Sequence, residues 1–190
     1  MQIKTKHLKN FISELKSRPI TDLDELISTV QTYAAQEERA EFIATTIQGI
    51  LKHNSLYKRP DLSVELLKQL GAESYFKEMI PKVFFGRQQG HSTGIATFIR
   101  NNANVNVIVV TSTSSLVAHV KDTLKNSHIE DVPVFSLSNP SSIRKIPEGT
   151  DLILVDEYPN DRSMSYQTLL SLVSNSVYTG TPLITLGTMF

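Results

Sequence analysis

Apolar residues in the first 80 positions recur at the three- and four-residue spacing of helices that cover a core with one face. Pro19 ends a first run of this kind, over residues 8–15. Thr21 with Asp24 resembles a capping box and predicts the start of a long helix that reaches about residue 53. The apolar stripe expected on this long helix consists of Phe42, Ile43, Ile47, Ile50 and Leu51.

A further helix is expected to begin at Asp61 or Ser63. It should end at Gly71, because glycine adopts the left-handed conformation that terminates helices. We therefore predict a small helical bundle over residues 1–80. Nothing in these residues indicates a chemical activity of their own.

After Pro81 the pattern changes to short apolar runs that alternate with helix-compatible segments. Strands are predicted at 82–85, 105–110, 132–137, 152–155 and 183–186. Helices are predicted at 92–101, 114–126 and 165–176. Such alternation is typical of a parallel sheet with helices on both faces. The expected fold is α/β, a three-layer core with a mostly parallel sheet over residues 81–190, preceded by the helical region 1–80.

Composition excludes several classes of protein. With 19 Lys and Arg against 19 Asp and Glu, the chain is not a histone-like polycation. The absence of cysteine removes disulfides, thiolate metal sites and cysteine nucleophiles. The N-terminal residues lack the apolar centre of a signal peptide, and no run approaches the roughly 20 apolar residues of a membrane span. We expect a cytoplasmic protein without membrane contact.

Charge is distributed unevenly within the first 50 residues. Residues 1–20 carry five cations and one acid, whereas residues 21–50 carry six acids and one cation. The five cations are Lys4, Lys6, Lys9, Lys16 and Arg18. Such a basic segment either contacts nucleic-acid phosphates or is a solvated face, and the sequence leaves both interpretations open.

Residues 82–99, KVFFGRQQGHSTGIATFI, combine an apolar strand, a glycine-containing loop and a Ser-Thr pair that opens a helix. A triphosphate requires this order, because the loop N–H groups and the helix N-terminus converge on the anion. The usual pattern is G-x-x-x-x-G-K-[ST]. With Gly90 as anchor, the first glycine position falls on Phe85, the lysine position on His91 and the hydroxyl position on Ser92. Two of the four key positions therefore deviate.

Residues 151–159, DLILVDEYP, place Asp156 and Glu157 directly after four apolar residues. In a phosphate-loop enzyme such an aspartate holds the magnesium shell, and the glutamate polarises the attacking water. Alone, the string also fits a strand that ends in a solvated turn. Together with the preceding loop, in this order, it favours a site for ATP and Mg²⁺.

Residues 87–93, RQQGHST, resemble the R-Q-x-G-K-[ST] loop of large terminases, the viral DNA-packaging motors, which typically lacks the first glycine. Residues 107–124, 151–158 and 181–188 resemble that family's second strand with its helix, its acidic strand and its coupling strand. The resemblance covers residues 82–190, the ATPase core. Helicase-type ATPases share much of the same pattern.

The resemblance implies roles by position. It places the phosphates among Gln88, Gln89, Gly90, His91, Ser92 and Thr93. Ser92 and Asp156 would hold Mg²⁺, and Glu157 would be the catalytic carboxylate. Arg87 would sense the nucleotide or stabilise transition-state charge, with a solvated loop arginine as the alternative.

Further implications of the resemblance concern coupling, topology and partners. Thr185 or Thr188 would couple the nucleotide state to the next segment, with ordinary strand-end threonines as the alternative. The strand at 183–186 would insert between those at 82–85 and 152–155. The implied partners are nucleotide, double-stranded DNA and other packaging-motor subunits, in the host cytoplasm if the protein is viral.

Two features depart from the family. His91 replaces the lysine, and imidazole is shorter and mostly neutral near pH 7.5. The chain ends at Phe190, where a packaging motor would continue. We expect either a piece of a longer protein or a small relative.

Three functions remain open from sequence alone. The first is an ATP-binding module with weak or slow hydrolysis, an ATPase if active. The second is a catalytically inactive derivative that acts as a protein- or DNA-interaction module. The third is a helicase-like motor whose second lobe is on another chain.

Overall fold

The computed structural model describes residues 23–190 except 86–89, 144–145, 158, 160 and 189–190. For residues 23–26, 28–30, 85, 142, 143 and 188 only the backbone is described. The first helix expected from the sequence, over residues 8–15, and the basic segment lie outside the described residues.

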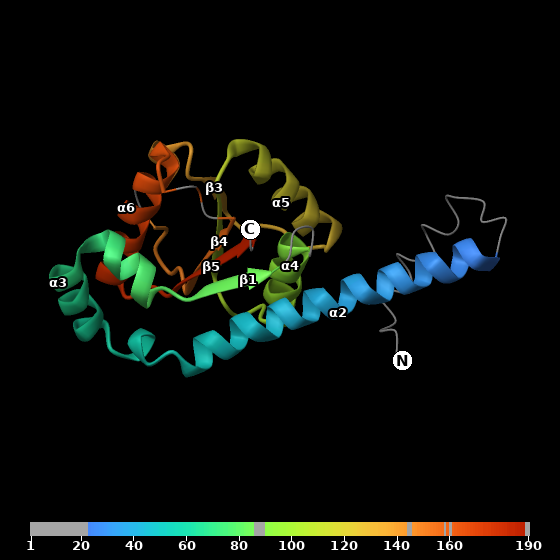
Figure 1. Ribbon diagram of the computed structural model, residues 1–190, viewed down its shortest axis with the longest axis horizontal. Coiled ribbons are helices and arrows are strands. Elements are labelled where there is room, and N and C mark those ends of the chain that lie inside the picture. The colour runs from blue at the N-terminus through green and yellow to red at the C-terminus, as the bar shows by residue number, and fades with distance from the viewer. Residues whose placement is uncertain (1–22, 86–89, 144–145, 158, 160, 189–190) are drawn as a thin grey trace.

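Five strands and five α-helices make up the described chain (Figure 1). The helices are α2 (Leu23–His53), α3 (Pro60–Met79), α4 (His91–Asn101), α5 (Ser114–Asn126) and α6 (Met164–Thr179). The strands are β1 (Lys82–Phe85), β2 (Val107–Thr111), β3 (Val134–Ser136), β4 (Leu152–Asp156) and β5 (Leu183–Thr188). Two 3₁₀ turns, η1 (Ser55–Lys58) and η2 (Pro140–Ile143), complete the elements. The strands and helices predicted after Pro81 are all present, with ends that differ by up to three residues.

The strands form one parallel sheet in the order β1-β5-β4-β2-β3. The prediction that the 183–186 strand inserts between the other two is confirmed, because β5 pairs with β1 on one side and with β4 on the other. Parallel strands align their carboxyl ends at one edge of the sheet. This topology therefore brings the ends of β1 and β4 to the same edge.

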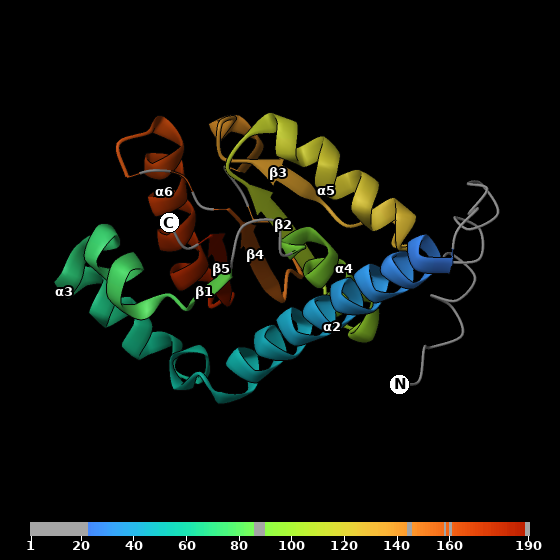
Figure 2. The same ribbon diagram turned by 45° about the vertical axis from the view of Figure 1, so that its right-hand side comes forward.

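Helices cover both faces of the sheet, which gives three layers (Figure 2). One face packs against α2, α4 and α5, and the other against α3 and α6. The N-terminal helices α2 and α3 therefore lie in opposite layers, and the predicted bundle over residues 1–80 is not seen among the described residues. The sheet is apolar on both faces and offers each helix more surface to bury than another short helix would.

The apolar stripe of α2 differs from the expected one at Phe42. Ile43 and Ile47 are buried against α4, together with Ala40 and Ala44. Phe42, expected in the stripe, is 64% exposed. Successive helical residues are about 100° apart, so Phe42 cannot share the face of Ile43.

Gly71 has a φ of +76° and breaks the regular helix of α3, as its residue type indicates. A second helical segment then continues to Met79. The residue pattern did not predict this segment.

Lys82 fastens the end of α3 to the start of β1. Its ammonium donates hydrogen bonds to the carbonyls of Phe76, Lys77 and Ile80 and lies 4.7 Å from the centre of the Phe76 ring. Carbonyls at a helix C-terminus lack intrahelical partners and carry partial negative charge, so a cation stabilises them. Partial burial lowers the pKa of Lys82.

Gly94 sets the approach of α2 to α4. A Cβ atom at this position would lie 2.5–2.6 Å from Cγ2 and Cβ of Ile43. The Ile43 side chain is fully buried and its Cβ is fixed to the backbone, so it cannot move away cheaply. The two helices cross closely because glycine stands at this point.

We predict that Gly94→Ala lowers the free energy of unfolding by about 1–3 kcal/mol, since overpacking costs this much in a dense core. Gly49→Ala is the matched control, because nothing lies within 4 Å of an added Cβ in α2 there. It should stabilise by about 0.5–1 kcal/mol through helix propensity. Urea denaturation of both variants measures the difference, and equal effects of the two substitutions would contradict the prediction.

We expect Lys82→Met to lower the free energy of unfolding by about 1–3 kcal/mol, because three helix-end carbonyls lose a charged donor. Lys77→Met is the control, since the Lys77 ammonium forms an exposed ion pair with Glu73 on the same helix and should change stability by less than about 0.5 kcal/mol. Thermal unfolding followed by circular dichroism compares the two. A Lys82 variant as stable as the Lys77 variant would show that the three bonds contribute nothing net.

Candidate functional site

The candidate site lies at the carboxyl edge of the sheet, where α4 begins and β4 ends. Gly90 precedes α4 with a left-handed φ of +73°, and its carbonyl accepts the first helical hydrogen bond, from Gly94. Its position therefore requires glycine for a reason of backbone geometry. The first N–H groups of a helix have no partner within the helix itself, and in α4 they lie at this edge of the sheet.

Ser92 and Asp156 are joined across 64 residues of sequence. The Ser92 hydroxyl donates a hydrogen bond of 2.8 Å to Oδ2 of Asp156, and both side chains are buried. The strand register places Asp156 at the last residue of β4, opposite Thr111 on β2 and Leu186 on β5. The loop-helix segment and the acidic strand singled out in the sequence thus meet in one place.

His91 also turns toward Asp156. Its Nδ1 atom lies 3.7 Å from Oδ1 of Asp156, and the imidazole is only 7% exposed. This separation exceeds the length of a hydrogen bond, about 2.7–3.2 Å. The residue at the lysine position of the loop therefore faces the carboxylate that ends β4.

Burial dominates the electrostatics of Asp156. It raises the pKa of this carboxyl above its ordinary value of 3.8. The Ser92 hydrogen bond and the charge of His91 act in the opposite direction without cancelling the effect, and the neighbouring Glu157 carboxylate raises the pKa further. Among the described residues, Oδ1 of Asp156 has no hydrogen-bond partner although it is fully buried.

Glu157 is exposed and follows directly on the buried aspartate. Its φ of +56° is unusual for a residue with a side chain, and the conformation costs on the order of 1–3 kcal/mol. The Glu157 N–H donates a 3.0 Å hydrogen bond to the Leu186 carbonyl, which holds the strained residue against β5. A strained backbone at an exposed glutamate that follows a buried aspartate makes this strand end a candidate functional position.

The remaining predicted site residues are placed only in part. Thr93 is exposed on the first turn of α4. Thr185 is buried, and its hydroxyl donates to the Pro81 carbonyl, so it joins β5 to the residue before β1. Arg87, Gln88 and Gln89 lie outside the described residues, as does the side chain of Thr188. Their roles stay predictions.

The contact between His91 and Asp156 is the feature that sequence reasoning missed. The loop pattern places His91 at the phosphates alone. The apolar residues that follow it, such as Ile95 and Phe98, indicate a helix start that is itself buried. No spacing rule pairs two residues 65 positions apart, so only the fold brings them together.

Comparison of the chain with protein-family models and with curated proteins gives no match. Within the described ranges, no three His, Cys, Asp or Glu side chains are grouped as metal ligands. The same part of the chain contains no helix with the length and apolar character to cross a membrane. Any functional assignment therefore depends on the geometry at the edge of the sheet.

We predict that Asp156→Asn stabilises the protein at pH 8 by about 0.5–2 kcal/mol, because it removes a charge that burial disfavours. A carboxyl whose folded pKa is raised favours folding below its unfolded pKa, and this contribution is lost as the pH rises through the folded value. The gain from the substitution should therefore grow from pH 4 upward and then level off.

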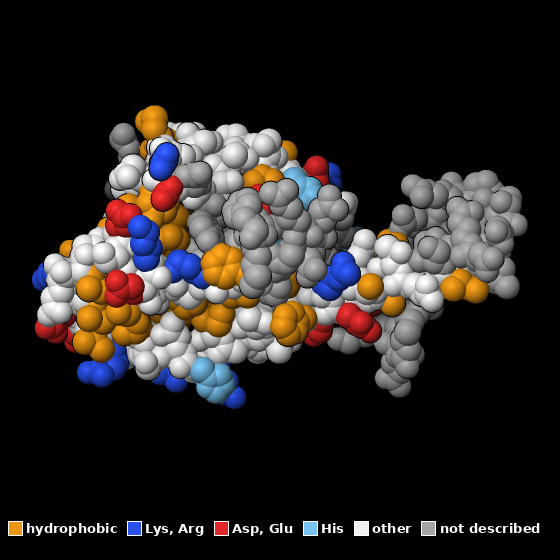
Figure 3. All heavy atoms as spheres, viewed as in Figure 1, with side chains coloured by type: hydrophobic (Ala, Val, Ile, Leu, Met, Phe, Trp, Pro, Cys, Tyr) orange, Lys and Arg blue, Asp and Glu red, His pale blue; other side chains and the backbone are white. Residues whose placement is uncertain are grey.

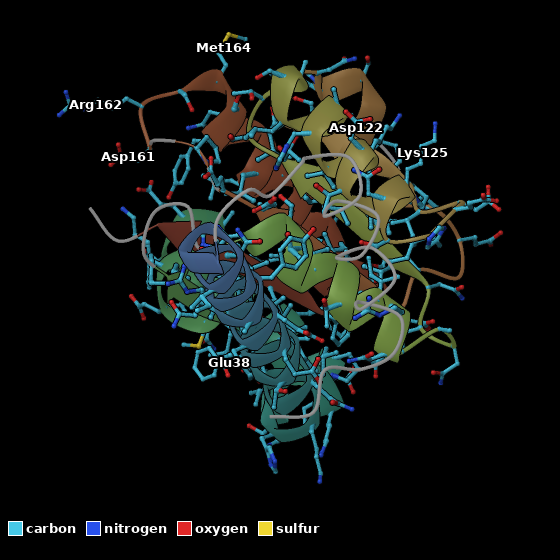
Figure 4. All side chains as sticks on the ribbon, turned by 90° about the vertical axis from the view of Figure 1, so that its right-hand side faces the viewer. Glu38, Asp122, Lys125, Asp161, Arg162 and Met164 are labelled. Carbon is cyan, nitrogen blue, oxygen red and sulfur yellow. The ribbon has the colours of Figure 1, made fainter. Side chains whose placement is uncertain are left out.

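Asp122→Asn is the matched control, because Asp122 is exposed on α5, where Figure 4 labels it. It should leave stability nearly constant across the same range. Urea unfolding at several pH values, with a chelator present, measures both variants. A destabilised Asp156→Asn protein at pH 8 would mean that the charged carboxylate holds the fold together.

Proposed function

We propose that this chain is an ATP-binding module of the phosphate-loop type, similar to the ATPase core of large terminases, with weak or slow hydrolysis. The observation that carries the proposal is the hydrogen bond between Ser92 and Asp156. It joins the N-terminus of α4, which follows Gly90, to the buried acidic end of β4. In the sheet, β5 lies between β4 and β1, the strand that precedes the loop. An anion bound at the start of α4 would therefore lie beside carboxylates able to hold its cation.

The side chains fit a Mg²⁺ ion that arrives with the nucleotide. Mg²⁺ prefers oxygen ligands, and Ser92 and Asp156 provide a hydroxyl and a carboxylate within one hydrogen bond of each other. The buried Oδ1 of Asp156, without a hydrogen-bond partner among the described residues, has capacity for a further interaction. When bound, the ion would neutralise charge on the β and γ phosphates.

The protein's own groups would then divide the remaining work. The start of α4, with Gly90 and Thr93, would receive the phosphates through backbone and hydroxyl groups. Glu157, exposed beside the aspartate, would orient and polarise the attacking water. Arg87, Gln88 and Gln89 keep the roles that the loop resemblance implies.

His91 accounts for the weak activity we propose. The imidazole faces Asp156, where a lysine would extend to the phosphates on a longer stem. Loss of one charge-assisted hydrogen bond costs about 1.5–3 kcal/mol, which weakens binding or the transition state by roughly tenfold to over a hundredfold.

The approach of His91 to Asp156 also favours a second candidate, a catalytically inactive module that retains the fold to interact with protein or DNA. Both carboxylate oxygens of Asp156 have a neighbour within the protein, Ser92 on one and His91 on the other.

Lys, Arg, Asp and Glu side chains are interspersed on the face shown in Figure 3, so no large patch of one charge marks a DNA surface there. The basic N-terminal segment, double-stranded DNA and motor subunits remain proposed partners of either candidate.

We expect His91→Lys to raise the hydrolysis rate at saturating ATP·Mg by at least about tenfold, since the lysine contacts oxygens whose charge changes in the transition state. Adding Glu157→Gln should abolish the gain and leave binding nearly unchanged. Release of inorganic phosphate measures the hydrolysis rate, and isothermal titration measures the affinity for ATP·Mg. Ser92→Ala serves as the binding-site control.

The outcomes separate the two candidates. Binding of ATP in His91→Lys but not in the Ser92→Ala variant supports the phosphate-loop site. Failure of both the natural chain and His91→Lys to bind ATP would overturn the proposal and favour the interaction module. Good binding without hydrolysis in His91→Lys would leave a nucleotide-binding protein that is not an autonomous ATPase.

A further inference from the structure

The replacement of lysine by histidine changes the ligand chemistry of the site as well as its charge. Lysine offers donors only, whereas a neutral imidazole nitrogen is a metal ligand. Here that ring lies against a buried carboxylate, with 3.7 Å between Nδ1 of His91 and Oδ1 of Asp156. Both residues are more than nine-tenths buried. The pair could supply two of the four ligands of a tetrahedral metal site.

Asp156 supplies the second observation. Its Oδ1 is fully buried, accepts no hydrogen bond within the described chain, and is the carboxylate oxygen nearer to His91. Buried carboxylates are usually paired, hydrogen-bonded or bound to metal, because an uncompensated buried charge is costly. Oδ2 already accepts the Ser92 hydroxyl, which fixes the orientation of the carboxylate in the way outer hydrogen bonds orient metal ligands.

We propose that His91 and Asp156, whose carboxylate is oriented by Ser92, together bind a divalent transition-metal ion such as Zn²⁺ or Co²⁺, and that this ion can take the place of Mg²⁺ beside a bound nucleotide. Only the part of this inference that concerns the nucleotide rests on the proposed function. The pair of His91 and Asp156 does not depend on that function.

The distance favours a tetrahedral ion. With bonds of about 2.1 Å, two tetrahedral ligands lie about 3.4 Å apart, so the pair needs to close by only about 0.3 Å. Neighbouring ligands of an octahedral ion with similar bonds lie about 3.0 Å apart, which requires about 0.7 Å of closure in a packed interior. A site with one nitrogen and one oxygen ligand also suits zinc and cobalt better than magnesium.

Two protein ligands leave the coordination shell incomplete. No third His, Cys, Asp or Glu joins the pair among the described residues, so a structural zinc site of the closed kind is excluded there. Water or phosphate oxygens of a bound nucleotide would have to supply the remaining ligands. Such an open site binds metal with modest affinity, and the nucleotide should strengthen that binding.

The test uses the full chain without nucleotide, titrated with Co²⁺ and followed by visible absorption, which is strong for tetrahedral cobalt and weak for octahedral cobalt. We expect saturable absorption in the natural sequence and at least about tenfold weaker binding in His91→Gln. The matched control is His128→Gln, since His128 is exposed, follows α5, and lines a pocket with Asn106 and Val107 at the start of β2, the opposite end of the strands from Asp156. It should bind cobalt as the natural sequence does. Zn²⁺ should displace the cobalt at equimolar amounts, whereas Mg²⁺ should not.

Circular dichroism checks that each variant is folded. If His91→Gln does not fold, Asp156→Asn replaces it, with the same expected loss of absorption. Absence of saturable absorption in the natural sequence overturns the inference, and so does equal cobalt binding in the His91 and His128 variants.

A parallel titration with a fluorescent ATP analogue and Mg²⁺ separates the two proposals. Cobalt binding without nucleotide binding would retain the metal pair and remove the ATP function. Nucleotide binding with Mg²⁺ but no cobalt binding would do the reverse.

Discussion

The hydrogen bond from Ser92 to Asp156 is the interaction that defines this site. It requires a helix that starts at the carboxyl edge of the sheet and a strand that delivers a carboxylate to that edge. The parallel order with β5 inserted between β1 and β4 satisfies both requirements. The tight approach of α2 at Gly94 then holds α4 in place two residues from Ser92. The site therefore depends on tertiary packing as well as on the local loop.

Burial explains why this edge of the sheet is chemically unusual. Asp156 is 3% exposed, and the next residue is an exposed glutamate in a left-handed conformation. A chain selected only for stability would place neither group here, because each costs free energy. Sites that bind or transform ligands commonly retain such costs. The arrangement is consistent with either candidate function, since a nucleotide site that loses catalysis can keep its binding groups.

The sequence predicted the alternation of strands and helices after residue 81, because buried parallel strands are apolar throughout and therefore easy to find. The insertion of β5 between β1 and β4 followed from the terminase resemblance. Periodicity alone did not fix the outward position of Phe42 or the layer in which α2 and α3 lie, since those depend on which surfaces are available to bury. The site residues Ser92 and Asp156 followed from motif chemistry. The orientation of His91 did not, because no local pattern encodes a contact over 65 residues.

The long helix α2 extends well beyond the sheet, with its N-terminal part projecting from the body (Figure 1). Its crossing point with α4 is Ile43 against Gly94, and about 20 residues, or roughly 30 Å, separate that point from the start of the helix. This crossing point would act as the pivot of α2, and it lies one helical turn along α4 from Gly90. A tilt of only about 5° at the pivot displaces the far end by roughly 2.6 Å, given that length. Any change in the angle at which α2 crosses α4 would therefore move the start of α2 much further than it moves the crossing point.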